Sequence, residues 1–532
     1  MWYDLSIFFY AQPCHIFSNR KEVAMYSMVM TSMLEGIHAV PVRVEVDIRP
    51  GLPSFDMVGF LSSEVREAKE RVKTALYNCG IVLPAKRITV NLSPANIKKS
   101  GTGFDVCIAV AILLALELVD EKQTLDTIFT GELNLRGDIL PVRGILPMVN
   151  DGKQLGFRRF VLPKENLCEA GLVKEVNLYG FSHLSELISF LKGTFYDTSG
   201  KMQIETNETE HTNDFEEVNG QHFLRRAAEV AASGMHNMLL VGPPGAGKTM
   251  ISERIATILP PLTEEECLEL TKIYSVCGLL DAQKGLIRNR PFRSPHHTIT
   301  KAGLVGGGMN LRPGEISLAH HGVLFLDELT EFDKSTLEVL RQPLEEHEIT
   351  ISRANGSVTY PSNILLLAAM NPCPCGYYPN MQKCRCTPAT VGRYLGRISQ
   401  PLLDRMDLCV EAPVVPFEEL TTRQKNESSA EIRARVNSCH LLQQKRFERE
   451  PFKHNSQIPS ARIREFCPLG EKEQSYMEKM FEKMNLTARA YHKILRVART
   501  IADMDENAQI LLRHLQEAVC YRSVNEKFWG GH

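Results

Sequence analysis

One short stretch limits the fold of this chain more than any other feature. The apolar run 239–241 leads into Gly242-Pro243-Pro244-Gly245-Ala246-Gly247-Lys248-Thr249, and a helix-forming run, 250–258, follows. Glycines at this spacing let consecutive backbone N–H groups turn toward one anion, and the start of the following helix adds partial positive charge. The ammonium of Lys248 can reach the β- and γ-phosphates of a nucleotide, and the Thr249 hydroxyl can ligate Mg²⁺. The pattern predicts an α/β fold with a nucleotide site at residues 242–249.

Two later strands end in polar residues that fit the same site. The apolar run 322–326 ends in Asp327-Glu328, and the run 364–369 leads to Met370-Asn371. In a parallel sheet the carboxyl ends of the strands meet at one edge, so these side chains should lie beside the phosphate loop. There Asp327 can hold the Mg²⁺ shell, Glu328 can polarise an attacking water, and Asn371 can orient that water. We therefore expect an ATPase that uses ATP and Mg²⁺.

The composition favours a large soluble enzyme of the cytoplasm. The chain has 532 residues, 43 % hydrophobic and 23 % charged, which is enough for two or three domains. Its longest apolar run, 106–116, is too short to span a bilayer, so no membrane partner is expected. The 14 cysteines without a secretory signal favour reduced thiols. A formal net charge of −2 means that any nucleic-acid binding must come from local patches.

Changes of pattern divide the chain into six segments. Alternating residues over 42–46 and 88–92 predict strands, and helical spacing over 62–77 and 104–118 predicts helices. The six expected segments are an N-terminal extension or a start codon assigned too early (1–24), an α+β domain (25–195), an acidic linker (196–217), the ATPase core (218–412), a connector (413–458) and a helical, basic C-terminal lid (459–532).

The block from Asp214 to Tyr521 resembles the magnesium-chelatase-like branch of the AAA+ ATPases, and within it the ComM/YifB family. The resemblance rests on the phosphate loop and on segments 214–221, 290–297, 314–320, 371–376, 401–405 and 489–503. It implies a parallel-sheet P-loop core with a C-terminal helical lid. It also implies a homohexameric ring that moves branched or single-stranded DNA, as in branch migration during recombination of incoming DNA. The alternative is a protein-remodelling or chelatase-type assembly ATPase.

The same resemblance assigns three catalytic roles. Asn371 would be sensor 1, Arg405 the arginine finger that reaches the γ-phosphate of a neighbouring subunit, and Arg489 sensor 2 on the lid. An arginine supplied from a neighbour stabilises charge on the transferred phosphoryl group. From the residues alone, Arg405 could instead pair with a nearby aspartate, Asp404 or Asp407, and Arg397 competes for its role.

The N-terminal domain resembles a Lon-protease-like (S5-like) domain through residues 131–142. Where that family has its serine nucleophile, this chain has Gly103, and where the general-base lysine follows 144–145, it has Leu146. Acyl chemistry needs a nucleophile and a base within hydrogen-bond reach. We therefore expect no protease activity and interpret the domain as a binding or assembly platform.

Two segments are candidates for DNA contact. Between residues 281 and 315 the chain has basic residues but no acidic ones, and Arg288, Arg290 and Arg293 would contact phosphates. The alternative is a segment packed on its own domain. Residues 349–360 form a predicted β-hairpin with an Asn355-Gly356 turn, which places Arg353 near its tip.

Four cysteines form two close pairs, Cys373-x-Cys375 and Cys384-x-Cys386. Four thiolates over so short a stretch suit tetrahedral Zn²⁺, although Cys-x-Cys is tighter than the usual spacing. Reduced structural cysteines and redox pairs are the alternatives.

Overall fold

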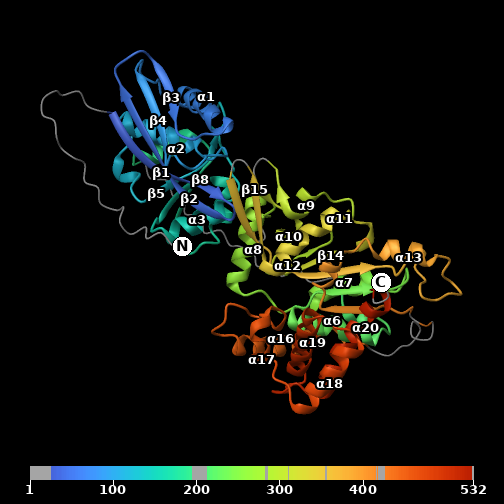
Figure 1. The fold of residues 1–532 in the computed structure, drawn as a ribbon. Helices are drawn as coiled ribbons and strands as arrows, with labels where there is room; N and C mark the ends of the chain where they lie inside the picture. Colours follow the sequence, from blue (N-terminus) through green and yellow to red (C-terminus); the bar gives the residue numbers. More distant parts are fainter. Residues whose placement is uncertain are drawn as a thin grey trace.

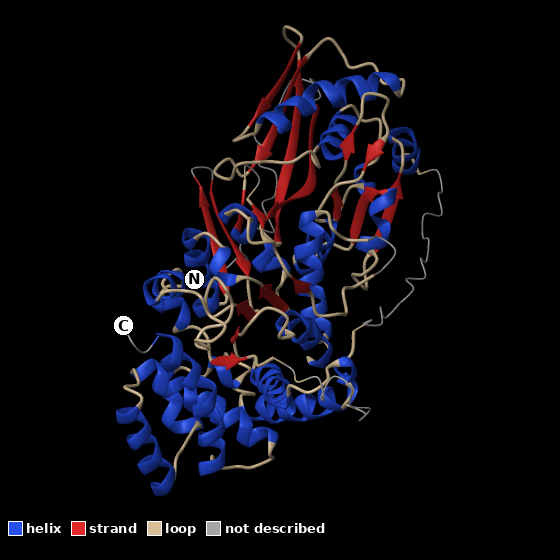
Figure 2. Ribbon diagram, turned by 90° about the vertical axis from the view of Figure 1, so that its right-hand side faces the viewer, coloured by secondary structure: helices blue, strands red, loops and turns tan. Residues whose placement is uncertain are grey.

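The computed structural model describes residues 25–193, 213–281, 285–308, 311–353, 356–414, 416 and 426–529. Three parts follow one another along the chain: an N-terminal domain, a central α/β core and a helical C-terminal lid (Figure 1). Strands occur in the first two parts, whereas the lid is helical (Figure 2). Residues 1–24 and most of the expected linker lie outside the described residues. Within the described chain, no helix is long and apolar enough to cross a membrane.

The N-terminal domain is built on a seven-stranded mixed sheet with the order β3-β4-β2-β1-β5-β8-β9. Residues alternate between buried and solvent-facing along β4, as the sequence pattern predicts. Helix α1 turns Val65, Ala68, Val72 and Leu76 inward. The elements of this domain are β1 (Met25–Glu35), β2 (His38–Arg49), β3 (Ser54–Val58), α1 (Ser63–Asn78), β4 (Arg87–Ser93), α2 (Asp105–Ala115), β5 (Thr127–Phe129), β6 (Glu132–Leu133), β7 (Ile139–Leu140), α3 (Ile145–Gln154), β8 (Arg159–Pro163), α4 (Leu167–Ala170), β9 (Asn177–Phe181) and α5 (Leu184–Leu191).

The central core confirms the predicted parallel sheet. Its five strands have the order β11-β14-β17-β10-β18, and every neighbouring pair is parallel. The strands are β10 (Met238–Val241), β11 (Phe292–Arg293), β14 (Val323–Leu326), β17 (Leu365–Met370) and β18 (Leu408–Glu411). The helices are α6 (His222–Gly234), α7 (Lys248–Ile258), α8 (Glu264–Cys277), α9 (Lys301–Val305), α10 (Glu315–Leu318), α11 (Lys334–Leu337), α12 (Arg341–Glu346), α13 (Pro388–Leu395) and α14 (Gln400–Leu403).

Two small antiparallel pairs lie outside the five-stranded sheet and pack on the core through part of their residues. The strands β12 (Gly306–Gly307) and β13 (Arg312–Pro313) lie in the basic segment. The predicted hairpin consists of β15 (Glu348–Arg353) and β16 (Gly356–Pro361), with Arg353 opposite Gly356. Its turn lies outside the described residues. The hairpin lies in the chain segment between β14 and β17, the two strands that lead to Asp327 and Asn371.

The helical lid begins earlier than the sequence pattern suggested. The segment expected as a connector contains α16 (Ser429–Arg446), which packs on α6 and α7 and shares their hydrophobic core. The end of the expected linker is also part of the core, because Phe215 is buried and Asp214 accepts a hydrogen bond from the Ser429 backbone N–H. The remaining lid helices are α17 (Ile463–Phe466), α18 (Glu471–Lys483), α19 (Ala488–Met504) and α20 (Leu512–Trp529).

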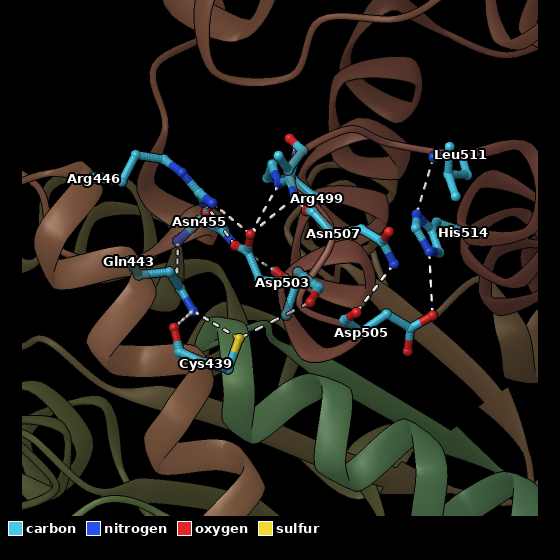
Figure 3. Close-up of polar contacts among 12 residues, drawn as sticks. Cys439, Gln443, Arg446, Asn455, Arg499, Asp503, Asp505, Asn507, Leu511 and His514 are labelled. Atoms are coloured by element: carbon cyan, nitrogen blue, oxygen red, sulfur yellow. Dashed lines mark hydrogen bonds and ion pairs between the residues drawn. The ribbon is translucent and has the colours of Figure 1, made fainter.

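A buried carboxylate ties the lid together (Figure 3). Asp503 on α19 accepts hydrogen bonds from Arg446 of α16 at 2.6 Å, from Arg499 at 3.1 Å and from the Asn455 amide at 2.8 Å. A buried charge is tolerated only when it is paired and hydrogen-bonded, so this carboxylate fixes α16 and α19 relative to each other. Arg499 is consequently occupied within the lid.

The N-terminal domain docks on the core through α8 and the hairpin. Lys272 of α8 forms an ion pair with Asp151 of α3 at 3.0 Å, and both side chains are nearly buried. The backbone N–H of Gly144 donates to the Ser275 carbonyl. At Gly36, in the β1–β2 turn, an added Cβ would lie 2.8 Å from Val358 of β16. The N-terminal domain therefore contacts the hairpin directly.

Candidate nucleotide-hydrolysis site

The structure brings most of the predicted catalytic residues together at one edge of the core sheet. Strand β17 lies between β14 and β10, so the residues that follow these three strands are neighbours. The Thr249 hydroxyl donates to Asp327 at 2.8 Å, and the Lys248 ammonium donates to the Asn371 amide oxygen at 3.2 Å. Mg²⁺ prefers oxygen ligands and usually binds only one or two protein groups, so a hydroxyl in contact with a carboxylate suits it. Thr249 and Asp327 therefore fit a Mg²⁺ shell.

The phosphate loop has the conformation that its glycines allow. Gly245 and Gly247 have φ of +75° and +74°, in the left-handed region that glycine adopts freely. The Lys248 ammonium donates to the carbonyls of Gly242 and Pro243 at 2.7 and 2.9 Å. Burial lowers its pKa, while the carboxylates of Asp327 and Glu328 oppose that shift. Phosphate oxygens would offer this lysine better partners than the carbonyls, so the loop fits a nucleotide.

Glu328 has a neighbour that the sequence analysis did not assign. Its backbone is left-handed, with φ of +51°, and its N–H donates to the Asp327 carboxylate at 2.9 Å. The carboxylate is 61 % exposed and lies 3.7 Å from Nδ1 of His297. His297 belongs to the Arg-Ser-Pro-His-His run that carried part of the family resemblance, and only its place within that run could have indicated a role.

A second residue missed from the sequence is Gln221, just before α6. Its side chain is buried, and its amide nitrogen donates to the carbonyl of Ala246 in the phosphate loop. A Cβ added at Gly247 would lie 3.2 Å from the same amide. Gln221 therefore supports the loop from the side of α6.

Arg405 and Arg489 lie at the opposite edge of the sheet. Both line a cavity of about 420 Å³, the amino-end cavity, together with Met235 and Asn237, which precede β10. The phosphate loop instead follows β10, and four strand residues span about 13 Å. The structure thus separates these two arginines from the phosphate loop of their own chain.

The two arginines differ in their pairing. Arg405 donates to the Pro401 carbonyl and forms an ion pair with Glu345, not with either aspartate considered from the sequence. Arg489 is exposed, and no described side chain pairs with it. The competitor Arg397 contacts Glu331 at 3.4 Å and the Thr330 carbonyl at 3.0 Å. It is therefore engaged near the loop that follows Glu328.

Three of the four arginines predicted to contact DNA, Arg288, Arg290 and Arg293, form ion pairs with carboxylates of other elements. Arg290 is 10 % exposed, lies 3.5 Å from Glu266, and donates to the His321 carbonyl at 2.6 Å. Arg293 forms a bidentate pair with Glu315 at 2.6 and 2.7 Å. Arg288, 44 % exposed, contacts Glu264 at 2.8 Å. These pairs correspond to the alternative of a segment packed on its own domain, because each guanidinium has a carboxylate nearby from another element.

The four cysteines cluster as a tetrahedral metal site requires. The Sγ–Sγ distances are 3.4 Å for Cys373–Cys375, 3.8 Å for Cys373–Cys384 and 3.6 Å for Cys375–Cys384, and Cys386 lies within 4.8 Å of the others. Tetrahedral zinc with Zn–S bonds of about 2.3 Å holds its sulfurs about 3.8 Å apart. A disulfide would require about 2.05 Å.

The N-terminal domain has a side-chain-free position where a serine nucleophile would be. A Cβ added at Gly103 would lie 2.9 Å from the Thr130 hydroxyl, and Leu146 is fully buried at the start of α3. Lys99 is also buried, but its ammonium donates to the carbonyls of Pro94 and Ile97. This lysine is thus engaged in holding its own loop.

Family profiles account for most of the chain. Residues 214–420 match the family described as "Magnesium chelatase, subunit ChlI", residues 44–166 match "Subunit ChlI of Mg-chelatase", and residues 426–522 match "Magnesium chelatase, subunit ChlI C-terminal". These matches and the site define an AAA+ ATPase of the magnesium-chelatase-like class, a class that uses nucleotide and Mg²⁺.

Two relatives extend the match over nearly the whole length. The chain is 41 % identical over 500 residues to "Uncharacterized protein YifB" of Salmonella typhimurium, covering 94 % of this chain and 97 % of that protein. It is 40 % identical over 500 residues to "Competence protein ComM" of Haemophilus influenzae, covering 92 % and 96 %. A shorter likeness, 33 % over 66 residues, joins it to "Archaeal Lon protease" of Pyrococcus abyssi, covering 12 % and 6 %. The chain belongs to the ComM/YifB family.

Proposed function

We propose that this ATPase assembles into a ring and moves DNA, with branch migration during uptake and recombination of incoming DNA as its task. The observation that carries the proposal is the β15–β16 hairpin, which lies in the chain segment between the strand before Asp327 and the strand before Asn371. Any shift between these two strands during hydrolysis would be passed to the hairpin. The relative named as a competence protein supports DNA as the substrate.

The positions of Arg405 and Arg489 support the proposed ring. The phosphate loop has no described arginine finger of its own, because Arg405 lines the amino-end cavity at the other edge of the sheet. Arg489 lines the same cavity. In our proposal both arginines serve the nucleotide of a neighbouring subunit, and a closed homohexamer supplies every site with such a pair.

We assign DNA contact to two exposed residues of the basic segment and to one residue of the hairpin. Lys301 at the start of α9 and Arg312 in β13 are exposed, and Arg353 is the last residue of β15. In a ring, copies of these residues from every subunit would line one channel, and their phosphate contacts would add.

The proposal is tested by the ATPase rate with forked and linear DNA of equal length. We expect DNA to stimulate hydrolysis, forked DNA most, and Arg353→Ala to keep hydrolysis while losing fork movement. No stimulation by any DNA would favour the protein-remodelling alternative, in which the N-terminal domain holds a protein client.

We also propose that Cys373, Cys375, Cys384 and Cys386 hold one structural Zn²⁺. The sulfur spacing supports this proposal over redox pairs, because the sulfurs of Cys373, Cys375 and Cys384 lie 3.4–3.8 Å apart, well beyond the length of a disulfide bond, and all four thiols are free. Metal analysis of the purified protein should give about one zinc per chain.

A further inference from the structure

We infer that the cysteine loop, residues 371–387, is a metal-dependent support of the phosphate loop, so that loss of its ion weakens nucleotide binding. This inference rests on the proposed zinc site and extends it from a structural role to control of the ATP site. Four observations carry it.

The cysteine loop begins inside the ATP site. Asn371, its first residue, accepts a hydrogen bond from Lys248, and Cys373 is fully buried two residues later. The first metal-ligating position is therefore close in the chain to a residue that contacts the phosphate-binding lysine.

The loop also contacts the phosphate loop directly. Gly376 has φ of +85°, and its N–H donates to the Cys373 carbonyl at 2.9 Å, which closes a tight turn between two of the cysteines. A Cβ added at Gly376 would lie 2.4 Å from Cδ of Pro244. The turn that carries Cys373 and Cys375 thus lies against the middle of the phosphate loop.

The phosphate loop has other supports, mainly from Lys248, which donates to the carbonyls of Gly242 and Pro243, and from β17, whose Met370 carbonyl accepts the Gly242 N–H at 3.1 Å. A Cβ at Gly242 would meet the Ala412 carbonyl at 2.4 Å, and Gln221 holds the Ala246 end. At Gly245 an added Cβ would meet nothing within 4 Å. Between Gly242 and Ala246, the cysteine loop supports the phosphate loop through the contact of Gly376 with Pro244.

Without an ion, the outer part of the cysteine loop is held mainly by local hydrogen bonds to Asn380. Residues 380–383 are exposed, and the N–H of Cys384 donates to the Asn380 carbonyl at 2.7 Å. On its far side the loop packs against α20, where the rings of Tyr378 and Phe528 are 6.1 Å apart. A metal bound to both cysteine pairs closes this loop covalently and reduces its freedom, as structural zinc does in small domains. Removal of the ion would release the turn at Gly376 and, with it, one wall of the phosphate loop.

The first experiment extracts zinc from the intact wild-type protein with a chelator and then adds Zn²⁺ alone. Metal content is measured by mass spectrometry, and affinity is measured by titration with a fluorescent ADP. We expect extraction to raise the dissociation constant about tenfold, because a less preorganised loop must be ordered on binding, and re-addition to restore it. The hydrolysis rate at saturating ATP should change less than KM, since Glu328 and Asp327 are on another strand.

The second experiment uses variants. Cys384→Ser with Cys386→Ser should lose both zinc and nucleotide affinity, with Cys520→Ser on α20 as the matched control. Gly376→Ala should keep zinc yet bind nucleotide more weakly. Gly80→Ala is its control, because Gly80 has a similar φ of +81° and open space around it in the N-terminal domain. Melting curves verify that each variant is folded.

The outcomes separate the two proposals. Two results would contradict support of the phosphate loop but not the zinc site. One is zinc loss with unchanged ADP affinity, and the other is a Gly376→Ala variant that binds ADP like the Gly80→Ala control. Absence of zinc from the wild-type protein would overturn both proposals. Neither result touches the assignment of Lys248, Asp327 and Glu328.

Discussion

The two ends of the strands in the core sheet, here called the carboxyl edge and the amino edge, lack different parts of an ATPase site. The carboxyl edge brings together Lys248 of the phosphate loop, the Thr249–Asp327 pair that fits Mg²⁺, and Glu328, the predicted catalytic base. The amino edge has a cavity lined by Arg405 and Arg489 but no phosphate loop. One edge can bind a nucleotide but has no arginine finger among its described residues, and the other offers arginines without a nucleotide.

In the proposed ring, each edge would supply what the other lacks. A guanidinium must lie near the γ-phosphate to stabilise the charge that develops there. Four strand residues separate the edges, so Arg405 cannot make that contact in its own chain without unfolding part of the sheet. Stacking the amino edge of one subunit on the carboxyl edge of the next solves the problem.

The largest effects are expected at the carboxyl edge. Lys248→Ala should abolish hydrolysis and weaken ATP binding, since it removes the charge facing the β- and γ-phosphates. Glu328→Gln should still bind ATP but turn over at least about a hundredfold more slowly, because water activation by a positioned base is worth about that much. Steady-state ATPase and fluorescent-nucleotide binding measure both. Normal turnover by the glutamine variant would contradict the role of Glu328.

At the amino edge, Arg405→Ala should lower the rate by about a thousandfold if it acts as a finger on a neighbour. The defining test mixes Arg405→Ala with Lys248→Ala subunits, each inactive alone. Mixed rings contain interfaces with an intact lysine and an intact arginine, so activity should partly return.

The same mixing with Arg489→Ala shows whether the lid arginine serves its own site or that of a neighbour. Rescue by Lys248→Ala subunits places it across the interface with Arg405. If light scattering with ATP and Mg²⁺ shows only monomers, and these monomers hydrolyse ATP well, neither arginine acts on a neighbouring subunit.

The sequence predicted the carboxyl edge well and the amino edge poorly, for a physical reason. The residues of the phosphate loop and of the strand ends are local signals, and a parallel sheet brings its carboxyl ends together whatever the rest of the chain does. Thr249 and Asp327 could therefore be paired from the sequence alone.

Which arginine is free and which is buried depends on partners far along the chain. Arg290 meets His321 and Glu266, which no spacing rule links to it. The start of the lid was missed for a similar reason. Helix α16 has polar residues on most of its surface, and only its packing on α6 and α7 reveals that it belongs to the lid.

The buried arginine gives the next prediction. Arg290→Ala should destabilise the protein by about 3–5 kcal/mol, because it removes the guanidinium that neutralises Glu266 and leaves the carbonyls of Pro260 and His321 without this donor. The matched variant is Arg312→Ala, an exposed arginine of the same basic segment, which should change stability by less than about 0.5 kcal/mol. Denaturant unfolding compares the two.

In DNA binding, we expect the exposed Arg312 to matter more than the buried Arg290. Arg312→Ala should reduce the slope of log affinity against log salt by about 0.7–0.9, the value for one lost phosphate contact. If Arg290→Ala were stable and reduced DNA affinity as strongly as Arg312→Ala, Arg290 would contact DNA and would not serve mainly to neutralise Glu266.

The smallest expected effect concerns the joint between the lid and the amino edge. His440 of α16 donates to the Ala232 carbonyl of α6 at 2.9 Å, and burial lowers its pKa to about 4, with Arg290 nearby adding to the shift and Glu266 opposing it. Between pH 6.5 and that value the unfolded chain binds this proton and the folded chain does not. Stability must therefore fall as the pH falls, by about 1.4 kcal/mol per unit for this group.

His454, also buried 5.0 Å away ring to ring, has its pKa lowered by burial and adds in the same direction. The depressed carboxylates, such as Asp407 beside Lys493, lose their contribution only at much lower pH. Buried carboxyl groups with a raised pKa, such as Glu169 and Asp105, act in the opposite direction, so melting at pH 7.5 and pH 5 is compared between the wild type and a histidine variant. His440→Gln keeps an N–H donor without the titration, so its loss of stability between the two values should be smaller by up to about 2 kcal/mol, whereas His222→Gln at the exposed start of α6 should follow the wild type. If His440→Gln lost as much stability as the wild type between pH 7.5 and pH 5, protonation of His440 would not explain the acid sensitivity.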